Sequence, residues 1–177
     1  MRDMTTAEYD EWREVIARRF AASQVAAGTW APDDAYARAV EANDAFLPDG
    51  RATAGMLFLK ATRPDGTPVG VLWVGLTHPR GVADCAFIYD IEIDEAYRGL
   101  GYGRALLAAA EAVVRSRGVG ALELNVFAEN TRAVRLYDSA GYRVVTQQMR
   151  KSLTEPVADR SGADRSGMEK PSPPARP

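Results

Sequence analysis

The sequence is short of the residues that build metal clusters and disulfides. Its 177 residues include one cysteine, Cys85, and one histidine, His78. A single cysteine excludes an internal disulfide and a cysteine-based zinc cluster, and a single histidine excludes a histidine-rich metal site. We therefore expect no bound metal. Cys85 is expected to be a small core residue, and His78, which precedes a proline, to be exposed in a turn.

Strong net charge and long apolar runs are absent as well. The formal net charge is −2 at pH 7, which is not the charge of a protein that binds nucleic acid or acidic membranes. No apolar run is long enough to cross a bilayer, and the first residues lead into a charged amphipathic pattern rather than a signal peptide. We expect a cytoplasmic protein with neither nucleic acid nor a membrane as partner.

Composition divides the chain into a globular domain and a tail. Overall, 46% of the residues are hydrophobic and 26% are charged, as in ordinary globular proteins. Residues 154–177 differ, because they contain five prolines, few large apolar residues and a tandem Ala-Asp-Arg-Ser-Gly. Such a segment buries too little apolar surface to offset its chain entropy. We expect one domain over residues 1–153 and a disordered tail after it.

Periodicity within the domain predicts a mixed α/β fold. Apolar residues at helical spacing predict helices from Thr5 to Gly28, Pro32 to Leu47, Gly101 to Arg117 and Asn130 to Gly141. Runs of β-forming residues predict strands at Met56–Thr62, Val69–Leu76, Cys85–Ile93, Ala121–Phe127 and Tyr142–Met149. The tryptophans at positions 12, 30 and 73 are predicted to lie in the core or in the wall of a cleft.

Three glycines at alternate positions stand between the strand 85–93 and the helix that follows it. They belong to the segment Tyr97–Arg104, which reads Tyr-Arg-Gly-Leu-Gly-Tyr-Gly-Arg. The start of a helix presents unpaired N–H groups and a positive dipole end, so this segment is expected to bind phosphate. A Walker loop is excluded because Arg104 and Ala105 follow Gly103 where lysine and then serine or threonine are needed. The spacing of the glycines disfavours a dinucleotide-binding fingerprint.

The same residues resemble the GNAT superfamily of N-acetyltransferases. Arg98–Gly103 matches the loop pattern Arg/Gln-x-x-Gly-x-Gly/Ala, and Asn130, Tyr137 and Gly141 follow at the family's spacing. The resemblance is strong over residues 85–150. It implies a central, mostly antiparallel sheet flanked by helices, in which the family's fourth and fifth strands splay apart.

The resemblance implies acetyl-CoA as cosubstrate and no metal. The loop amides would hold the diphosphate, and the strand backbone around Ile91 and Ile93 would pair with pantetheine, with an N–H near Ile93 polarising the thioester carbonyl. Asn130 would contact the cofactor while capping its helix, and Asn125 would steady the splayed strands. The expected cofactor-binding residues are Ile91, Ile93, Arg98, Gly99, Leu100, Gly101, Tyr102, Gly103, Arg104, Asn125, Asn130 and Ala133.

The implied reaction is direct attack of an amine on the thioester in a ternary complex. Tyr137 would protonate the departing thiolate. Asp90 and Glu92 alternate on an otherwise apolar strand and so share one face. Glu92 is the first candidate for the base that deprotonates the amine, Asp90 the second and Glu123 the third. The alternative for these acids is an ion pair with Arg98, Arg104 or an arginine of the first helix.

The acceptor is the part of the function that the sequence leaves open. Acidic residues near the expected cleft favour a small cationic amine. The alternatives are the N-terminal amine of a protein or peptide, and a CoA-binding sensor of the same fold without turnover. A dinucleotide-dependent enzyme is a third class, and the resemblance allows a homodimer without indicating an interface.

Overall fold

The computed structural model describes residues 1–151 and 153. Met1–Arg143 forms one compact unit, and a second unit begins at Val144. The predicted strand Tyr142–Met149 is wrong, because residues 142–151 contain neither strand nor helix. A strand needs a ladder partner as well as β-forming side chains, and the polar run Thr146-Gln147-Gln148 interrupts the apolar alternation. The predicted disordered tail lies outside the described residues.

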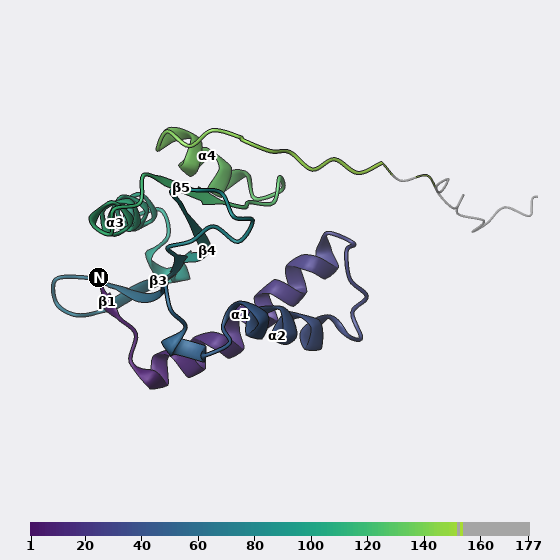
Figure 1. Ribbon diagram of the computed structural model, residues 1–177, viewed down its shortest axis with the longest axis horizontal. Coiled ribbons are helices and arrows are strands. Elements are labelled where there is room, and N and C mark those ends of the chain that lie inside the picture. Colours follow the sequence, from purple (N-terminus) through teal and green to yellow (C-terminus); the bar gives the residue numbers. More distant parts are fainter. Residues whose placement is uncertain (152, 154–177) are drawn as a thin grey trace, which may run out of the picture. The chain divides into compact units, whose positions relative to one another are not determined.

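Five strands form one mixed sheet in the order β1-β2-β3-β4-β5 (Figure 1). They are β1 (Arg2–Asp3), β2 (Met56–Thr62), β3 (Pro68–Gly75), β4 (Cys85–Ile93) and β5 (Ala121–Leu124). All neighbours are antiparallel except β4 and β5, which are parallel. The predicted mixed, mostly antiparallel sheet is confirmed. The two residues of β1 were not predicted, because so short a strand has no periodicity.

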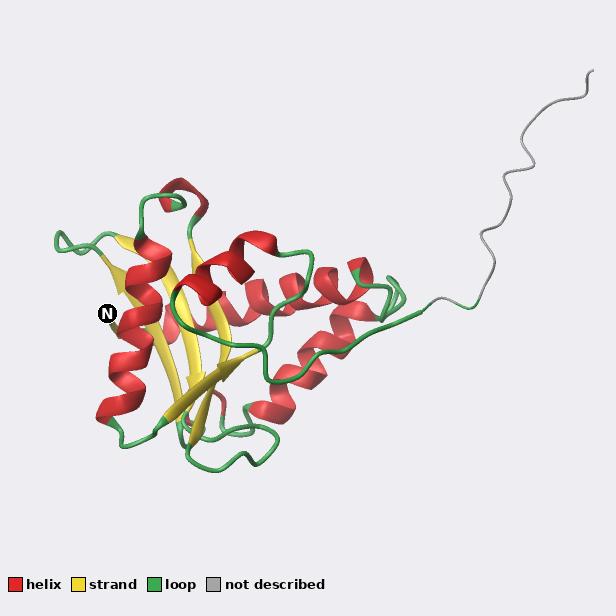
Figure 2. Cartoon of the chain, turned by 90° about the horizontal axis from the view of Figure 1, so that it is seen from above, coloured by secondary structure: helices red, strands yellow, loops and turns green. Residues whose placement is uncertain are grey.

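One face of the sheet is covered by α3 (Tyr102–Ser116) and α4 (Thr131–Ser139) (Figures 1 and 2). Leu106, Leu107 and Ala110 recur at helical spacing along α3 and are buried against Leu72 and Ile88 of the sheet. Each fully buried leucine contributes about 1.5–3 kcal/mol relative to an exposed one. This core therefore fixes α3, and with it the glycine loop that precedes the helix.

The opposite face is covered by α1 (Thr6–Ala26). Thr5 and Glu8 form a capping box at its start, which satisfies two backbone donors. Tyr9 and Trp12 of α1 pack on Trp73 and other aromatic residues of the sheet, so Trp12 and Trp73 are core residues. The outer helix α2 (Ala35–Phe46) packs on α1 through small side chains, which are Ala17, Ala21, Ala35 and Ala39.

β5 pairs along its whole length with only the first residues of β4. Their ladder runs from Cys85 and Ala121 to Ile88 and Leu124, whereas β4 itself continues to Ile93. β5 was predicted to reach Phe127 but ends at Leu124. In β4, the register against β3 shifts between Ile88 and Asp90, and such a bulge redirects the side chains beside it. The ladder between the two strands thus ends beside the irregularity of β4, and β4 continues beyond it without β5.

Candidate active site

A pocket opens where β4 and β5 part. Its wall comes from the end of β4, from the segment after β5 and from α4, and its polar side chains include those of Asp90, Asn125, Asn130 and Tyr137. The other lining residues are Ile88, Tyr89, Ile91, Leu124, Val126 and Phe127. Several predicted site residues, far apart in the sequence, thus meet in one cleft that combines apolar side chains with convergent polar groups, as small-molecule sites commonly do.

Tyr137 reaches the pocket from α4, and Asn130 determines where that helix begins. The Asn130 side chain accepts a hydrogen bond from the Ala133 N–H at 3.2 Å, as a helix cap does. Burial, and to a smaller extent the charge of Asp90, raises the pKa of the Tyr137 phenol. The phenol is therefore a proton donor, not a phenolate, throughout the neutral range.

Asp90 is the buried carboxylate of the pocket, with 7% of the residue exposed. It accepts a hydrogen bond from the Trp12 indole N–H at 3.0 Å, and Arg19 of α1 lies 3.4 Å from its other oxygen. Burial raises the pKa of Asp90, while Arg19 and Trp12 act in the opposite direction. A carboxylate with a raised pKa binds a proton more readily than an exposed aspartate does.

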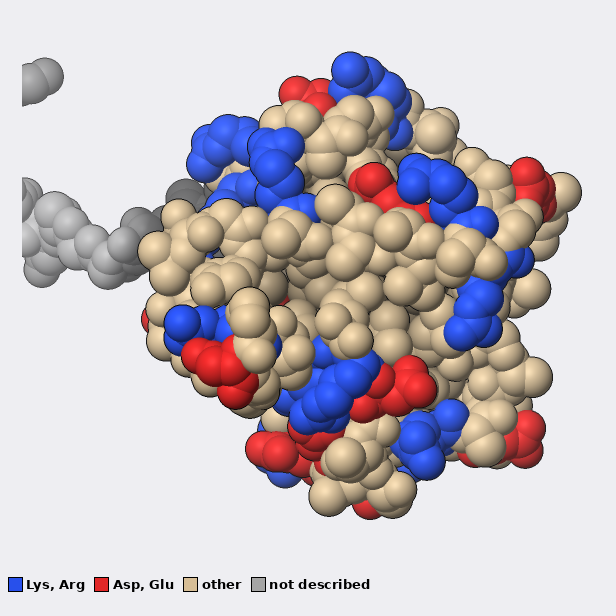
Figure 3. Space-filling model, turned by 90° about the vertical axis from the view of Figure 1, so that its left-hand side faces the viewer, with Lys and Arg blue, Asp and Glu red and all other residues tan. Residues whose placement is uncertain are grey.

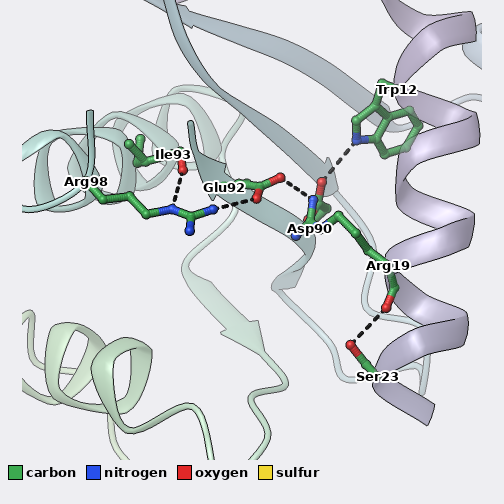
Figure 4. A network of polar contacts seen from close by, with 7 residues as sticks. All are labelled: Trp12, Arg19, Ser23, Asp90, Glu92, Ile93 and Arg98. Atoms are coloured by element: carbon green, nitrogen blue, oxygen red, sulfur yellow. Dashed lines mark hydrogen bonds and ion pairs between the residues drawn. The ribbon is translucent and has the colours of Figure 1, made fainter. Parts of the chain in front are cut away.

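Glu92 lies two residues further along β4 and is held by two arginines. It pairs with Arg19 on one side and with Arg98 at 3.0 Å on the other. Arg98 also donates to the Ile93 carbonyl at 2.9 Å. Figure 4 shows the resulting chain of contacts, which runs from α1 through both acids of β4 to the start of the glycine loop. The ion pair considered as an alternative in the sequence is thus present for both acids, with Arg19 for Asp90 and with Arg19 and Arg98 for Glu92.

The three glycines of the loop serve two different purposes. Gly99 and Gly101 have φ angles of +83° and +86°, a conformation that side chains resist. Gly101 caps α3, whose first residues present the free backbone N–H groups expected of a phosphate site. Gly103 has an ordinary helical backbone, and a side chain there would press on Leu136 of α4 at 3.3 Å. Gly103 therefore serves helix packing.

The arginines around the loop differ in their contacts. Arg104 donates to the side chain and the carbonyl of Ser139 and so ties α3 to α4. Arg132 lies beside the loop, with its guanidinium 4.0 Å from the position of a Cβ at Gly99. Sequence reasoning missed Arg132, although its place two residues after the helix cap Asn130 could have indicated it.

Of the other predicted cofactor residues, Ile91 lines the pocket, and the rest lie outside its lining. Ile91 and Ile93 pack on the core beneath α3, and Tyr102 packs edge-on against Tyr97 at 6.0 Å. Leu100 is 67% exposed at the tip of the loop. The Ala133 N–H is used by the Asn130 cap.

His78 and Glu123 lie apart from the pocket lining. The prediction of an exposed His78 is wrong, because only 5% of it is exposed and its ring stands edge-on to Phe87. Glu123 pairs with Arg80 at 2.5 Å. The turn after β3 folds back against β4, a long-range packing effect that the local turn pattern does not contain. Cys85 is buried, as predicted.

The surface carries charges of both signs. On the face drawn in Figure 3, basic and acidic side chains stand in small groups next to one another. None of the helices in the described part of the chain combines the length and the apolar character needed to cross a membrane.

Comparison with known proteins agrees with this geometry. The family model of the acetyltransferase (GNAT) family matches residues 11–142. The uncharacterized N-acetyltransferase YdgE of Bacillus subtilis is 33% identical, over 86% of this chain and 97% of its own. A mycothiol acetyltransferase of Thermobispora bispora is 36% identical, but the chain spans only 42% of its length.

A solved structure extends the agreement to three dimensions. The crystal structure of the acetyltransferase YycN from Bacillus subtilis superposes with a TM-score of 0.80 at 34% identity, covering 86% of this chain and 97% of that one. Sequence, fold and cleft thus point the same way, and the chain belongs to the GNAT family of acetyltransferases.

Proposed function

We propose that the protein transfers an acetyl group from acetyl-CoA to the primary amine of a small molecule. The observation that carries the proposal is the pocket between β4 and β5, which brings a protonated phenol, Tyr137, and a buried carboxylate, Asp90, to one cleft next to the glycine loop. An amine attacking a thioester needs these two groups, an acid for the leaving thiolate and a base for the ammonium.

The donor side is assigned to the loop and the parting strands. The α3 N-terminus, with Gly99 and Gly101 before it, would receive the diphosphate, and Arg132 would add a cation. Beyond Ile88, β4 has no ladder partner on its β5 side among the described residues. Its backbone groups are therefore available to pantetheine, in the manner of an added strand.

The proton steps are assigned to Asp90 and Tyr137. A lysine-like amine has a pKa of about 10.4 and must lose a proton before it attacks. Asp90 would take that proton, directly or through a water, and Tyr137 would give its proton to the CoA thiolate as the C–S bond breaks. Asp90 is preferred to Glu92, reversing the order favoured by the sequence, because two arginines hold Glu92.

The acceptor is proposed to be a small amine. Support comes from the mycothiol acetyltransferases among the relatives, which are named for mycothiol and not for a protein. The cleft adds a buried carboxylate, Asp90, beside the polar side chains of Asn125 and Asn130, which suits the ammonium group of a small polar amine. The alternative acceptor is the N-terminal amine of a peptide, and the alternative to turnover is CoA sensing.

Thiol release from acetyl-CoA tests the proposal directly. The full-length protein would be assayed against a panel of small primary amines and of short peptides with free N-termini, and product masses would be recorded. We expect release with one class of small amine and a mass gain of one acetyl group. Turnover only with peptides would show that the acceptor is a peptide N-terminus and not a small amine. Binding of acetyl-CoA without turnover on any amine would show that the protein is a CoA sensor and not an enzyme.

A further inference from the structure

The fold gathers the single histidine, the single cysteine and one glutamate of the sheet into one cluster. His78 lies in the turn between β3 and β4, Cys85 begins β4, and Glu123 lies on β5. Their ligand atoms, one from each residue, all lie within 4.8 Å of one another. With only one histidine and one cysteine in the sequence, we expected no metal site. The number of such residues, however, does not show whether the two lie next to each other in the fold.

The cluster contains a buried polar atom without a hydrogen bond. The His78 side chain is 0% exposed, and its Nε2 lies 3.4 Å from the nearer Glu123 oxygen without forming a hydrogen bond. An unsatisfied buried donor or acceptor costs about 1–3 kcal/mol. Cys85 is buried beside it, and Glu123 is 17% exposed, so an imidazole and a thiol, both common zinc ligands, share a site with one carboxylate that borders solvent.

We propose that His78 Nε2, Cys85 Sγ and a Glu123 carboxylate oxygen bind a Zn²⁺ ion, with a water at the fourth position. Tetrahedral ligands at about 2.0–2.3 Å from zinc are about 3.3–3.8 Å apart, so the three atoms need to close in by about 1 Å. On binding, the thiol gives its proton to solvent and the sulfur donates an electron pair to the metal. The imidazole stays neutral.

Two existing contacts oppose the ion and limit its affinity. The Arg80 guanidinium pairs with Glu123 at 2.5 Å, and the Arg80 backbone N–H donates to His78 Nδ1 at 3.1 Å. That second bond leaves the imidazole proton on Nε2, so metal binding must move the proton to Nδ1 and displace the N–H. The Arg80 side chain is 53% exposed and can turn to solvent.

Binding of the ion would link three segments of the fold. The three ligands come from the turn and from the ends of β4 and β5 that remain paired, so the ion would join these segments where the two strands meet. It would stabilise that junction while standing outside the pocket lined by Asp90 and Tyr137. The site is therefore independent of acetyl transfer, and its test does not depend on the acceptor.

Metal binding to the full-length protein without a histidine tag tests the proposal. Zn²⁺ is expected to bind at one ion per chain and to raise the unfolding temperature. Co²⁺ is expected to give a thiolate-to-cobalt charge-transfer absorption. Cys85→Ser should abolish that absorption. Cys85→Ser and His78→Gln should each weaken binding by more than the roughly 10–100-fold that losing a residue behind a metal ligand costs, with near-native circular dichroism as the check on folding.

Arg80→Ala provides a test that misfolding cannot mimic. Removing the guanidinium frees Glu123, so Zn²⁺ should bind several-fold more tightly, whereas the control Arg63→Ala, which removes an exposed pair with Asp65, should leave binding unchanged. Stoichiometric binding that survives both ligand substitutions would place the metal elsewhere and overturn the proposal. So would absence of binding in the unmodified protein and in Arg80→Ala.

Discussion

The two ends of the Figure 4 network are built in different ways. At the proposed cofactor site, the chain offers backbone, namely two glycines in a left-handed conformation and the N–H groups at the start of α3. Toward α1, it offers side chains from distant segments, since Trp12 and Arg19 reach Asp90 across more than seventy positions of sequence.

This difference explains why one side can be recognised from the sequence and the other cannot. A backbone site needs particular residues at adjacent positions, so it appears in the sequence as a motif and serves one cofactor throughout a family. A side-chain site can be assembled from any elements that the fold brings together, so it varies freely. The donor can thus be identified from a short segment, whereas the acceptor depends on packing between α1 and the sheet.

The largest expected effect comes from removing the acid. Tyr137→Phe keeps the ring that packs on the core and deletes only the hydroxyl. We expect kcat to fall by about 10²–10⁴-fold with little change in the KM for acetyl-CoA, because general acid catalysis acts on the leaving group. Steady-state kinetics check this result. Unchanged turnover would remove Tyr137 from the proton transfer.

A pair of glycine substitutions separates loop strain from cofactor binding. Gly101→Ala and Gly66→Ala place a side chain at nearly the same φ, +86° and +85°, so each should cost about 1–2 kcal/mol of stability. Only Gly101 lies in the loop, and only its variant should raise the KM for acetyl-CoA, by about tenfold. Equal KM values in the two variants would contradict a backbone site for the diphosphate.

The smallest expected effect lies at the start of α1, away from the chemistry. The Arg2 pair and the capping hydrogen bond lower the Glu8 pKa from 4.5 to about 2. A depressed carboxyl pKa stabilises the fold above pH 4.5, and this stabilisation is lost as the pH falls toward about 2. Glu8→Gln can keep the capping hydrogen bond but loses the ion pair with Arg2 and a negative charge at the start of the helix. It should therefore cost about 0.5–1 kcal/mol at pH 7, and less at pH 3, in thermal unfolding.

A neighbouring glutamate serves as the control for the cap. Glu11 lies in the same helix outside the capping box, so Glu11→Gln should change stability little at either pH. Neither variant should alter kcat. A pH-independent loss in Glu8→Gln would show that the lowered pKa does not contribute to folding.

Local patterns were sufficient for most of the fold. The stripe Leu106, Leu107 and Ala110 predicted α3, and the Thr5–Glu8 capping box predicted the start of α1, because helices depend on spacing within a few residues. The strand predicted at residues 142–149 failed because pairing is decided by a partner that local propensity does not reveal. The residues β1 adds to the sheet were too few to show a pattern.

The candidate site divides in the same way. The loop glycines and the Asn130 cap could be predicted because each acts on its own neighbours. The burial of His78 could not, because it depends on segments that meet only in the folded chain. The pairing of Glu92 with Arg19 was predicted only as one alternative. Alternation along β4 predicts that Asp90 and Glu92 share one face of the sheet, but not which helix packs on that face.

The pH dependence of kcat/KM for the amine, compared between Asp90→Asn and Glu92→Gln at saturating acetyl-CoA, tests the account most directly. Burial raises the Asp90 pKa, so activity should fall as the pH drops through that value and Asp90 becomes protonated. We predict that Asp90→Asn loses about 10²-fold or more and this acidic limb, whereas Glu92→Gln keeps the limb. Loss of the limb in Glu92→Gln, with Asp90→Asn retaining it, would contradict the account.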